Sequence, residues 1–231
     1  TYMEIQLLTQ SITLILLVAA ILVYFRIAEK YRIVDHPNER SSHSMATVRG
    51  GGIIFPLAVL IWSLINGFSL PWLVAGILLI AAVSFLDDLM LMSMILRFMV
   101  QLLAITFIFW QINVFRLQWP YLFAAYIFAI GWINAFNFMD GINGITPFIA
   151  LITFGTFLWV NQSVHFAPDG LLITAILSLL VFTWFNARKN ARCFAGDVGS
   201  VSMAFLLAFL MASLMNKTDM VVWMLFFTVY G

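Results

Sequence analysis

The chain reads Asn-Ala-Phe-Asn-Phe-Met-Asp-Gly-Ile-Asn-Gly over residues 134–144, between two apolar runs at 121–133 and 145–160. Three of its polar side chains recur at every third position: Asn134, Asn137 and Asp140. On a continuing helix that spacing keeps them near one face, and the two glycines let the backbone turn sharply and approach a ligand closely. Uncompensated polar groups of this kind cost several kcal/mol in hydrocarbon. We therefore interpret the stretch as a metal and phosphate site at the end of a membrane helix.

The composition excludes an ordinary soluble domain. Hydrophobic residues make up 64% of the chain and charged residues 9%, with a mean hydropathy of +1.05, whereas a soluble domain is about half apolar and a quarter charged. The sequence therefore predicts an integral membrane protein. The net charge of +1 says nothing about nucleic acid, and no basic tract suggests a nucleic-acid partner. The single cysteine, Cys193, excludes an internal disulfide and a Cys-based zinc site.

Hydrophobic runs predict an all-α, polytopic transmembrane bundle with about nine spans. The expected spans are Ile5–Phe25, Gly51–Ile65, Pro71–Leu86, Phe98–Ile112, Tyr121–Ile133, Ile145–Val160, Leu171–Phe185, Val201–Met215 and Met220 to the end. We expect one integral membrane catalytic domain over residues 1–231, incomplete at its C-terminus because the chain stops inside an apolar run.

Basic residues predict the orientation of the spans. Nine of them fall in the loops after the first, third and seventh spans, and two fall in the alternate loops. This asymmetry places the N-terminus outside and the first group of loops, together with residues 134–144, in the cytoplasm.

The same alternation brings four aspartates, from three hairpins, to the cytoplasmic face: Asp87, Asp88, Asp140 and Asp197. Carboxylates that meet at one face repel one another and raise each other's pKa, and a divalent cation relieves the repulsion. Oxygen ligands without cysteine or paired histidine favour Mg²⁺, or Mn²⁺, over zinc. Each motif alone also fits a solvated helix end or a helix cap; their coincidence on one face favours a site.

The first cytoplasmic loop adds basic groups and glycines. Its candidate anion-binding residues are Arg40, His43, Arg49 and Gly51, the last at the opening of a helix. Amides at a helix start can cradle an anion. The same residues also fit the ordinary excess of positive charge in a cytoplasmic loop, and this alternative stays open.

Four segments in this order resemble one family, the polyprenyl-phosphate N-acetylhexosamine-1-phosphate transferases: Arg40–Gly52, Phe85–Asp88, Asn134–Gly144 and Gly196–Ser200. The chain looks most like the bacterial subgroup that starts O-antigen or capsule chains. The resemblance implies transfer of a sugar-1-phosphate from a UDP-N-acetyl sugar to undecaprenyl phosphate, with release of UMP. It further implies a multi-pass protein of the bacterial cytoplasmic (inner) membrane, in contact with lipid, and it leaves a homodimer open.

The resemblance also implies residue roles. Asn137 and Asp197 match positions that hold Mg²⁺, and Asp87 and Asp88 match a catalytic pair of aspartates, one of which handles the lipid phosphate. The positions of the family that bind substrate correspond to Arg97, Asp140 and Asn143, and we add Asn134 and Gly196 from the same segments. Asn143 departs from the many members that carry a second aspartate there.

Two questions stay open at this stage. The lipid phosphate could attack directly, or a phospho-aspartate could form at Asp87 or Asp88. The alternative class of function is an ion-coupled transporter, because intramembrane Asp and Asn often mark ion pathways. Transporter sites lie near the middle of the membrane and accompany inverted repeats, whereas the acids here gather at one face. A non-catalytic membrane scaffold is the third possibility.

Overall fold

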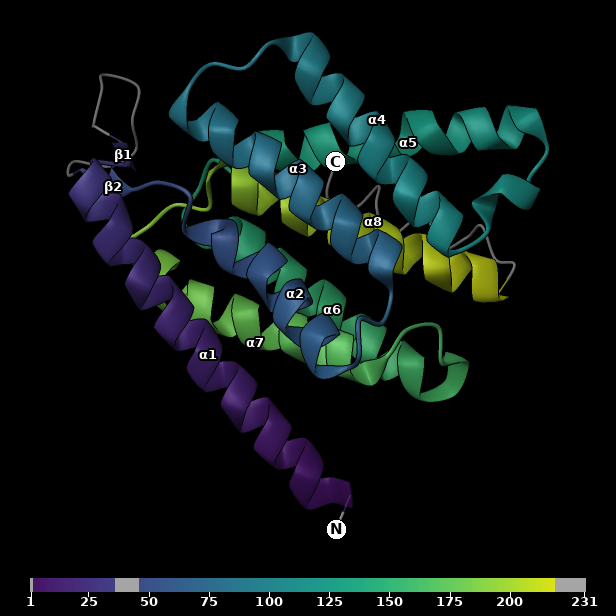
Figure 1. The fold of residues 1–231 in the computed structure, drawn as a ribbon, viewed down its shortest axis with the longest axis horizontal. Helices are drawn as coiled ribbons and strands as arrows, with labels where there is room; N and C mark the ends of the chain where they lie inside the picture. Colours follow the sequence, from purple (N-terminus) through teal and green to yellow (C-terminus); the bar gives the residue numbers. More distant parts are fainter. Residues whose placement is uncertain (1, 36–45, 219–231) are drawn as a thin grey trace.

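The computed structural model describes residues 2–35 and 46–218, which form an all-α membrane bundle (Figure 1). Its helices are α1 (Tyr2–Tyr31), α2 (Ile54–Ile65), α3 (Pro71–Leu89), α4 (Met94–Gln111), α5 (Trp119–Met139), α6 (Ile145–Val164), α7 (Asp169–Asn186) and α8 (Gly196–Thr218). Short elements complete it: the strands β1 (Val34–Asp35) and β2 (Thr47–Val48) and the 3-10 turns η1 (Gly51–Ile53) and η2 (Val114–Arg116).

Eight of the predicted spans coincide with these helices. Seven helices are long and apolar enough to cross a membrane, and the eighth segment, Gly51–Ile65, is shorter. The predicted all-α, polytopic bundle is therefore confirmed, and the ninth span, expected from Met220, lies outside the described residues. Most helices extend beyond the apolar runs because polar residues continue the helix at its ends, as at Asn134 and Asn137 in α5.

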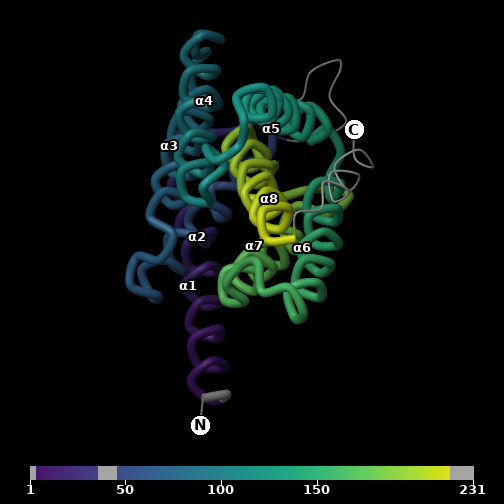
Figure 2. Tube along the Cα trace, turned by 90° about the vertical axis from the view of Figure 1, so that its right-hand side faces the viewer, coloured from purple at the N-terminus to yellow at the C-terminus, as the bar shows by residue number. Residues whose placement is uncertain are grey.

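Helix α8 is the centre of the bundle. Of its most apolar 18-residue stretch 89% is buried, against 17% for α5, and it packs against α2, α3, α5 and α6. Figure 2 shows α8 between α3 on one side and α6 on the other. The closest approach is at its start, where a Cβ on Gly199 would lie 2.7 Å from the Cα of Gly52. Glycine is required on both sides because the two backbones touch.

Short backbone pairings connect the segment after α1 to the loop before α8. Strand β1 pairs with β2, and Val48 bridges in parallel to Cys193 in the loop before α8. Phe194 donates its N–H to the Val48 carbonyl at 2.8 Å. In Figure 1 the ends of α1, α3 and α7 and the starts of α2 and α8 meet at the left of the molecule. Strands β1 and β2 and the loop before α8 thus form one assembly.

Candidate active site

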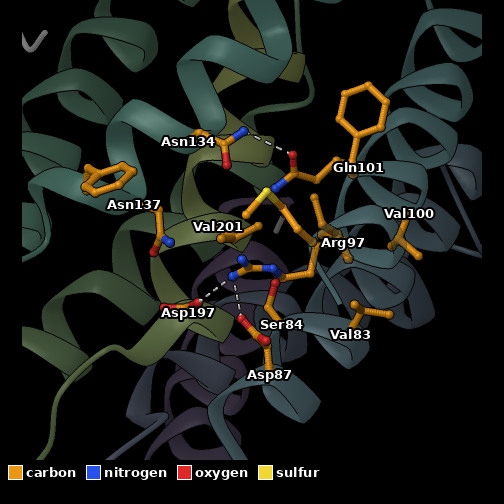
Figure 3. A pocket seen from close by; sticks show the side chains of 14 residues that line it. Val83, Ser84, Asp87, Arg97, Val100, Gln101, Asn134, Asn137, Asp197 and Val201 are labelled. Carbon is orange, nitrogen blue, oxygen red and sulfur yellow. Dashed lines mark hydrogen bonds and ion pairs between the residues drawn. The ribbon is translucent and has the colours of Figure 1, made fainter. Parts of the chain in front are cut away.

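An ion pair between Asp87 and Arg97 links the end of α3 to the start of α4. The Arg97 guanidinium lies 2.7 Å from Asp87 Oδ2 and 4.0 Å from Asp197 Oδ2 (Figure 3). The second oxygen of Asp87 accepts a hydrogen bond from the Met92 N–H at 2.9 Å. Arg97 therefore holds two carboxylates from different helices close together and offsets their repulsion.

Asp88, the next residue, points elsewhere. Its carboxylate accepts a charged hydrogen bond from Arg49 Nε at 2.8 Å, and its side chain is 0% exposed. It also accepts the backbone N–H groups of Asp197 at 3.1 Å and Val198 at 3.2 Å. These N–H groups belong to the first turn of α8, where the helix has no carbonyl of its own to accept them. The paired aspartates consequently have different surroundings.

A cavity of about 360 Å³, which we call the polar pocket, opens among the loops at the end of the bundle where α8 begins. Residues from four segments line it: Asp35, Arg49, Asn137, Asp140, Gly141, Ile142, Asn143, Asn186, Phe194, Ala195, Gly196, Asp197 and Ser200. Burial raises the pKa of the Asp140 carboxyl, and the charge of Asp197 raises it further. Carboxylates in this state gain from a cation placed between them and an anionic ligand.

A second cavity of about 260 Å³, the membrane pocket, lies between α3, α4, α5 and α8. Its lining mixes apolar side chains with Asp87, Arg97 and the pair Asn134 and Gln101, in which Asn134 Nδ2 donates to Gln101 Oε1 at 3.1 Å (Figure 3). Asn137 and Asp197 line both cavities. The polar pocket and the membrane pocket therefore meet at these two side chains.

In the turn after α5, one glycine adopts the sharp-turn geometry that the sequence predicts. Gly144 has φ +86°, in the left-handed region, and its N–H donates to Asn186 Oδ1 at 2.8 Å. Asn186 Nδ2 donates in turn to the Cys193 carbonyl at 2.9 Å. One buried amide at the end of α7 thus fixes both walls of the polar pocket.

The structure brings together most of the residues that the sequence predicts for the site. Asn137, Asp140, Asn143, Gly196 and Asp197 share the polar pocket. Asn134 lies apart from them, in the membrane pocket with Asp87 and Arg97. Arg40 and His43 lie outside the described residues.

The backbone geometry contradicts the prediction that the Gly51 amide helps to bind an anion. The Gly51 N–H donates to the Phe194 carbonyl at 2.8 Å, and the Gly52 N–H donates to Ala195 at 3.0 Å. A Cβ on Gly51 would also lie 2.7 Å from Cys193 Sγ. These amides hold the loop before α8 in place, because buried backbone donors require partners.

Asp197 and Asn137 carry oxygen atoms of the kind that Mg²⁺ prefers as ligands. In residues 2–35 and 46–218 no group of three His, Cys, Asp or Glu side chains is placed to hold a metal. Mg²⁺ usually takes one or two carboxylates and completes its octahedron with water and phosphate. Asp197 supplies one such carboxylate, and the Asn137 side chain lines the same two cavities. Asn137 Oδ1 accepts a hydrogen bond from Ser200 Oγ, which orients the amide.

Three residues of the site do not come from sequence reasoning: Gln101, Asn186 and Ser200. Gln101 is a single polar residue inside an apolar run, and Asn186 directly follows the run that ends at Phe185; a polar side chain in or at the end of a membrane span is a signal of function. Ser200 lies within the quoted Gly196–Ser200 segment but carries no charge that would single it out.

Comparison with known proteins identifies the family. The profile of glycosyl transferase family 4 matches residues 70–215, which include α3 to α8. The chain belongs to this family. The match contains Asp87, Asp88, Asn137, Asp140 and Asp197 and omits the first cytoplasmic loop.

Curated relatives agree with this assignment. A phospho-N-acetylmuramoyl-pentapeptide-transferase of Streptococcus pyogenes serotype M49 (strain NZ131) is 36% identical over 120 residues, which cover 48% of this chain and 34% of the relative. The transferase of the same name from serotype M5 (strain Manfredo) is 35% identical over 119 residues, with the same shares. The chain thus spans about a third of the length of these relatives.

Proposed function

We propose that this chain forms the core of a transferase that moves an N-acetylhexosamine-1-phosphate from a UDP-sugar to undecaprenyl phosphate and releases UMP. The observation that carries the proposal is the meeting of two unlike cavities at Asn137 and Asp197. A polar pocket among cytoplasmic loops suits a nucleotide sugar. A partly apolar pocket between membrane helices suits the phosphate end of a lipid. Family membership supports the same reaction class.

The chemical problem is the approach of two anions. The lipid phosphate is already ionised at neutral pH, so a strong base is not required, and positioning with charge neutralisation accounts for much of phosphoryl-transfer catalysis. Mg²⁺, or Mn²⁺, would neutralise charge on the diphosphate when bound by Asn137 and Asp197. Arg97 faces the membrane pocket and lies 4.0 Å from Asp197, where the two cavities meet, so in our proposal it binds both the incoming phosphate and the adjoining diphosphate. Asp87 holds the guanidinium in place.

Direct attack by the lipid phosphate is the mechanism that we propose. The competing double displacement would need a carboxylate free to attack phosphorus. Asp88 is fully buried and already accepts three hydrogen bonds, so of the pair only Asp87 faces a cavity. Release of UMP without any lipid acceptor would favour a phospho-aspartate at Asp87.

We place the protein in the bacterial cytoplasmic membrane, at the first step of a cell-envelope polysaccharide of the O-antigen or capsule type. This finer assignment depends on the resemblance of the four segments. An ion-coupled transporter gains no support from the described residues, because Asp87 lies in the last turn of α3 and Asp140 caps the end of α5.

The decisive experiment measures UMP release by the full-length protein in detergent. Undecaprenyl phosphate is paired with a panel of UDP-N-acetyl sugars, with and without EDTA. We expect UMP that requires both substrates and is lost with EDTA, and the active sugar names the donor. No UMP from folded protein under any pairing would overturn the proposal and would direct attention to ion binding at Asp140.

A further inference from the structure

Asp88 sits in a buried clasp at the start of α8, behind the wall of the polar pocket and outside the lining of both cavities. Three other segments of the chain complete the clasp. Arg49, from the loop before η1, supplies the charged partner at 2.8 Å, and α8 supplies two N–H donors. Tyr24 of α1 donates its hydroxyl to the Arg49 carbonyl at 2.6 Å, which fixes the backbone that carries the arginine.

The clasp leaves no room for a ligand at Asp88. A Cβ on Gly196 would lie 2.5 Å from Asp88 Oδ2 and 2.9 Å from the Gly50 nitrogen. Gly50 and Gly196 both have positive φ, +76° and +69°, a conformation that glycine adopts without strain. Two glycines therefore let the two chain segments close around the carboxylate. Neither cavity has Asp88 in its lining.

The position of Asp197 depends on this clasp. Its own N–H is one of the two that Asp88 accepts, while its carboxylate lies where the two cavities meet. A carboxylate at a helix N-terminus satisfies unpaired N–H groups and interacts favourably with the helix dipole. Here the capping carboxylate comes from another helix, so it sets both the place and the rotation of the first turn of α8.

We propose that Asp88, with Arg49, is a positioning residue that holds the start of α8 and thereby places Asp197 for Mg²⁺ and diphosphate binding. Asp87 alone of the pair lines a cavity, where it holds Arg97. This inference rests on the proposed function for its kinetic part only. Its structural part concerns the amides of Asp197 and Val198 and can be measured whether or not the protein releases UMP.

The test compares Asp88→Asn with Asp87→Asn in the full-length protein, in lipid nanodiscs. Hydrogen–deuterium exchange reports on the N–H groups of residues 196–200. We expect these amides to exchange roughly ten- to a hundredfold faster in Asp88→Asn, the range for loss of a hydrogen bond to a charged group. We expect no change in Asp87→Asn, since Asp87 accepts no N–H from α8.

UMP release then separates positioning from chemistry. In Asp88→Asn we expect the Mg²⁺ concentration for half-maximal activity to rise about tenfold, with most of kcat restored at saturating Mg²⁺. In Asp87→Asn we expect a loss that Mg²⁺ does not restore. Should Asp88→Asn not fold, Arg49→Ala and Arg49→Lys replace it. The alanine variant should show the faster exchange and the lysine variant should largely reverse it, because lysine restores the positive charge beside Asp88.

Two results would overturn the proposal. Asp88→Asn could lose activity as completely as Asp87→Asn while residues 196–200 exchange as in the wild type, which would place Asp88 in the chemistry. Alternatively, the amides of residues 196–200 could exchange faster in Asp88→Asn while the Mg²⁺ concentration for half-maximal activity stays unchanged. The clasp would then contribute to stability without influence on Asp197. If the wild type releases no UMP, the proposed function fails, and the exchange result still decides whether the clasp exists.

Discussion

Helices α5 and α8 both bring polar side chains to the candidate site, but in opposite surroundings. The most apolar stretch of α8 is 89% buried and that of α5 is 17% buried. Asp197 and Ser200 therefore stand on an element that the whole bundle holds, whereas Asn134 and Asn137 stand on one that faces its surroundings along most of its length. We infer from this difference that α8 fixes the positions of the site residues, and that substitutions on α5 should act locally.

The largest effect should follow Asp197→Asn on α8. We expect UMP release to fall by more than about a hundredfold, the order seen when a preorganised group that stabilises the transition state is removed, while the protein still inserts and folds. The matched control is Asp169→Asn, the same change at the start of α7 and the opposite end of the bundle, where Asp169 accepts a hydrogen bond from Asn161. Full activity in Asp197→Asn would remove this residue from the site, and recovery at higher Mg²⁺ would mean weakened metal binding only.

A pair of glycine substitutions contrasts the two helices directly. A Cβ on Gly199 of α8 would meet backbone at 2.7 Å, whereas a Cβ on Gly131 of α5 finds nothing within 4 Å among the described residues. We expect Gly199→Ala to lower the free energy of unfolding by about 1–3 kcal/mol or more through overpacking. Gly131→Ala should be neutral or stabilise by up to about 1 kcal/mol through helix propensity. Equal effects on the melting temperature would mean that the burial of α8 does not set its tolerance.

The reactivity of the Cys193 thiol provides an independent test of the same pair of glycine substitutions. Burial raises the pKa of its thiol to about 12, so the group is neutral and inaccessible in the wild type, and it should not react with N-ethylmaleimide at pH 7.5. Displacement of α8 in Gly199→Ala should expose it and make it react. A thiol that reacts equally in the wild type would contradict the packing of the loop before α8.

Arg97→Ala removes the link between Asp87 on α3 and Asp197 on α8. We expect kcat/KM for the UDP-sugar to fall about ten- to a hundredfold, as for loss of a charged contact. Because Arg97 faces the phosphates in our proposal, inhibition by UDP should weaken more than inhibition by uridine. Equal weakening of both would indicate that Arg97 has a structural role only.

The smallest effect should follow Asn134→Ala on α5. We expect the KM for the lipid acceptor to rise a few-fold and the free energy of unfolding to change by less than about 0.5 kcal/mol, as at an exposed position. Thr106→Val is the control, since the Thr106 hydroxyl lies 2.9 Å from that of Tyr126, another polar contact between α4 and α5 that lies outside the membrane pocket. A large loss of stability in Asn134→Ala would show that α5 is held as firmly as α8.

The sequence by itself determined the class of fold and the end of the bundle that carries the polar residues. Hydrophobic runs of membrane length can form only helices in lipid, and alternation of spans then brings Asp88, Asp140 and Asp197 to one face, as their contacts confirm. These conclusions need only local composition and connectivity.

The different surroundings of those residues depend on the tertiary structure alone. Successive residues on a helix point about 100° apart, so Asp87 and Asp88 had to diverge, but which of them faces the cavities depends on how α3 packs against α8 and Arg49. The same holds for Gly51, whose N–H turned to Phe194, and for Gln101 and Asn186, whose partners are distant in sequence. The physical reason is that a hydrogen bond forms between groups that are close in space. The length of a span can be predicted from a local stretch of chain, but the packing that brings distant residues together cannot.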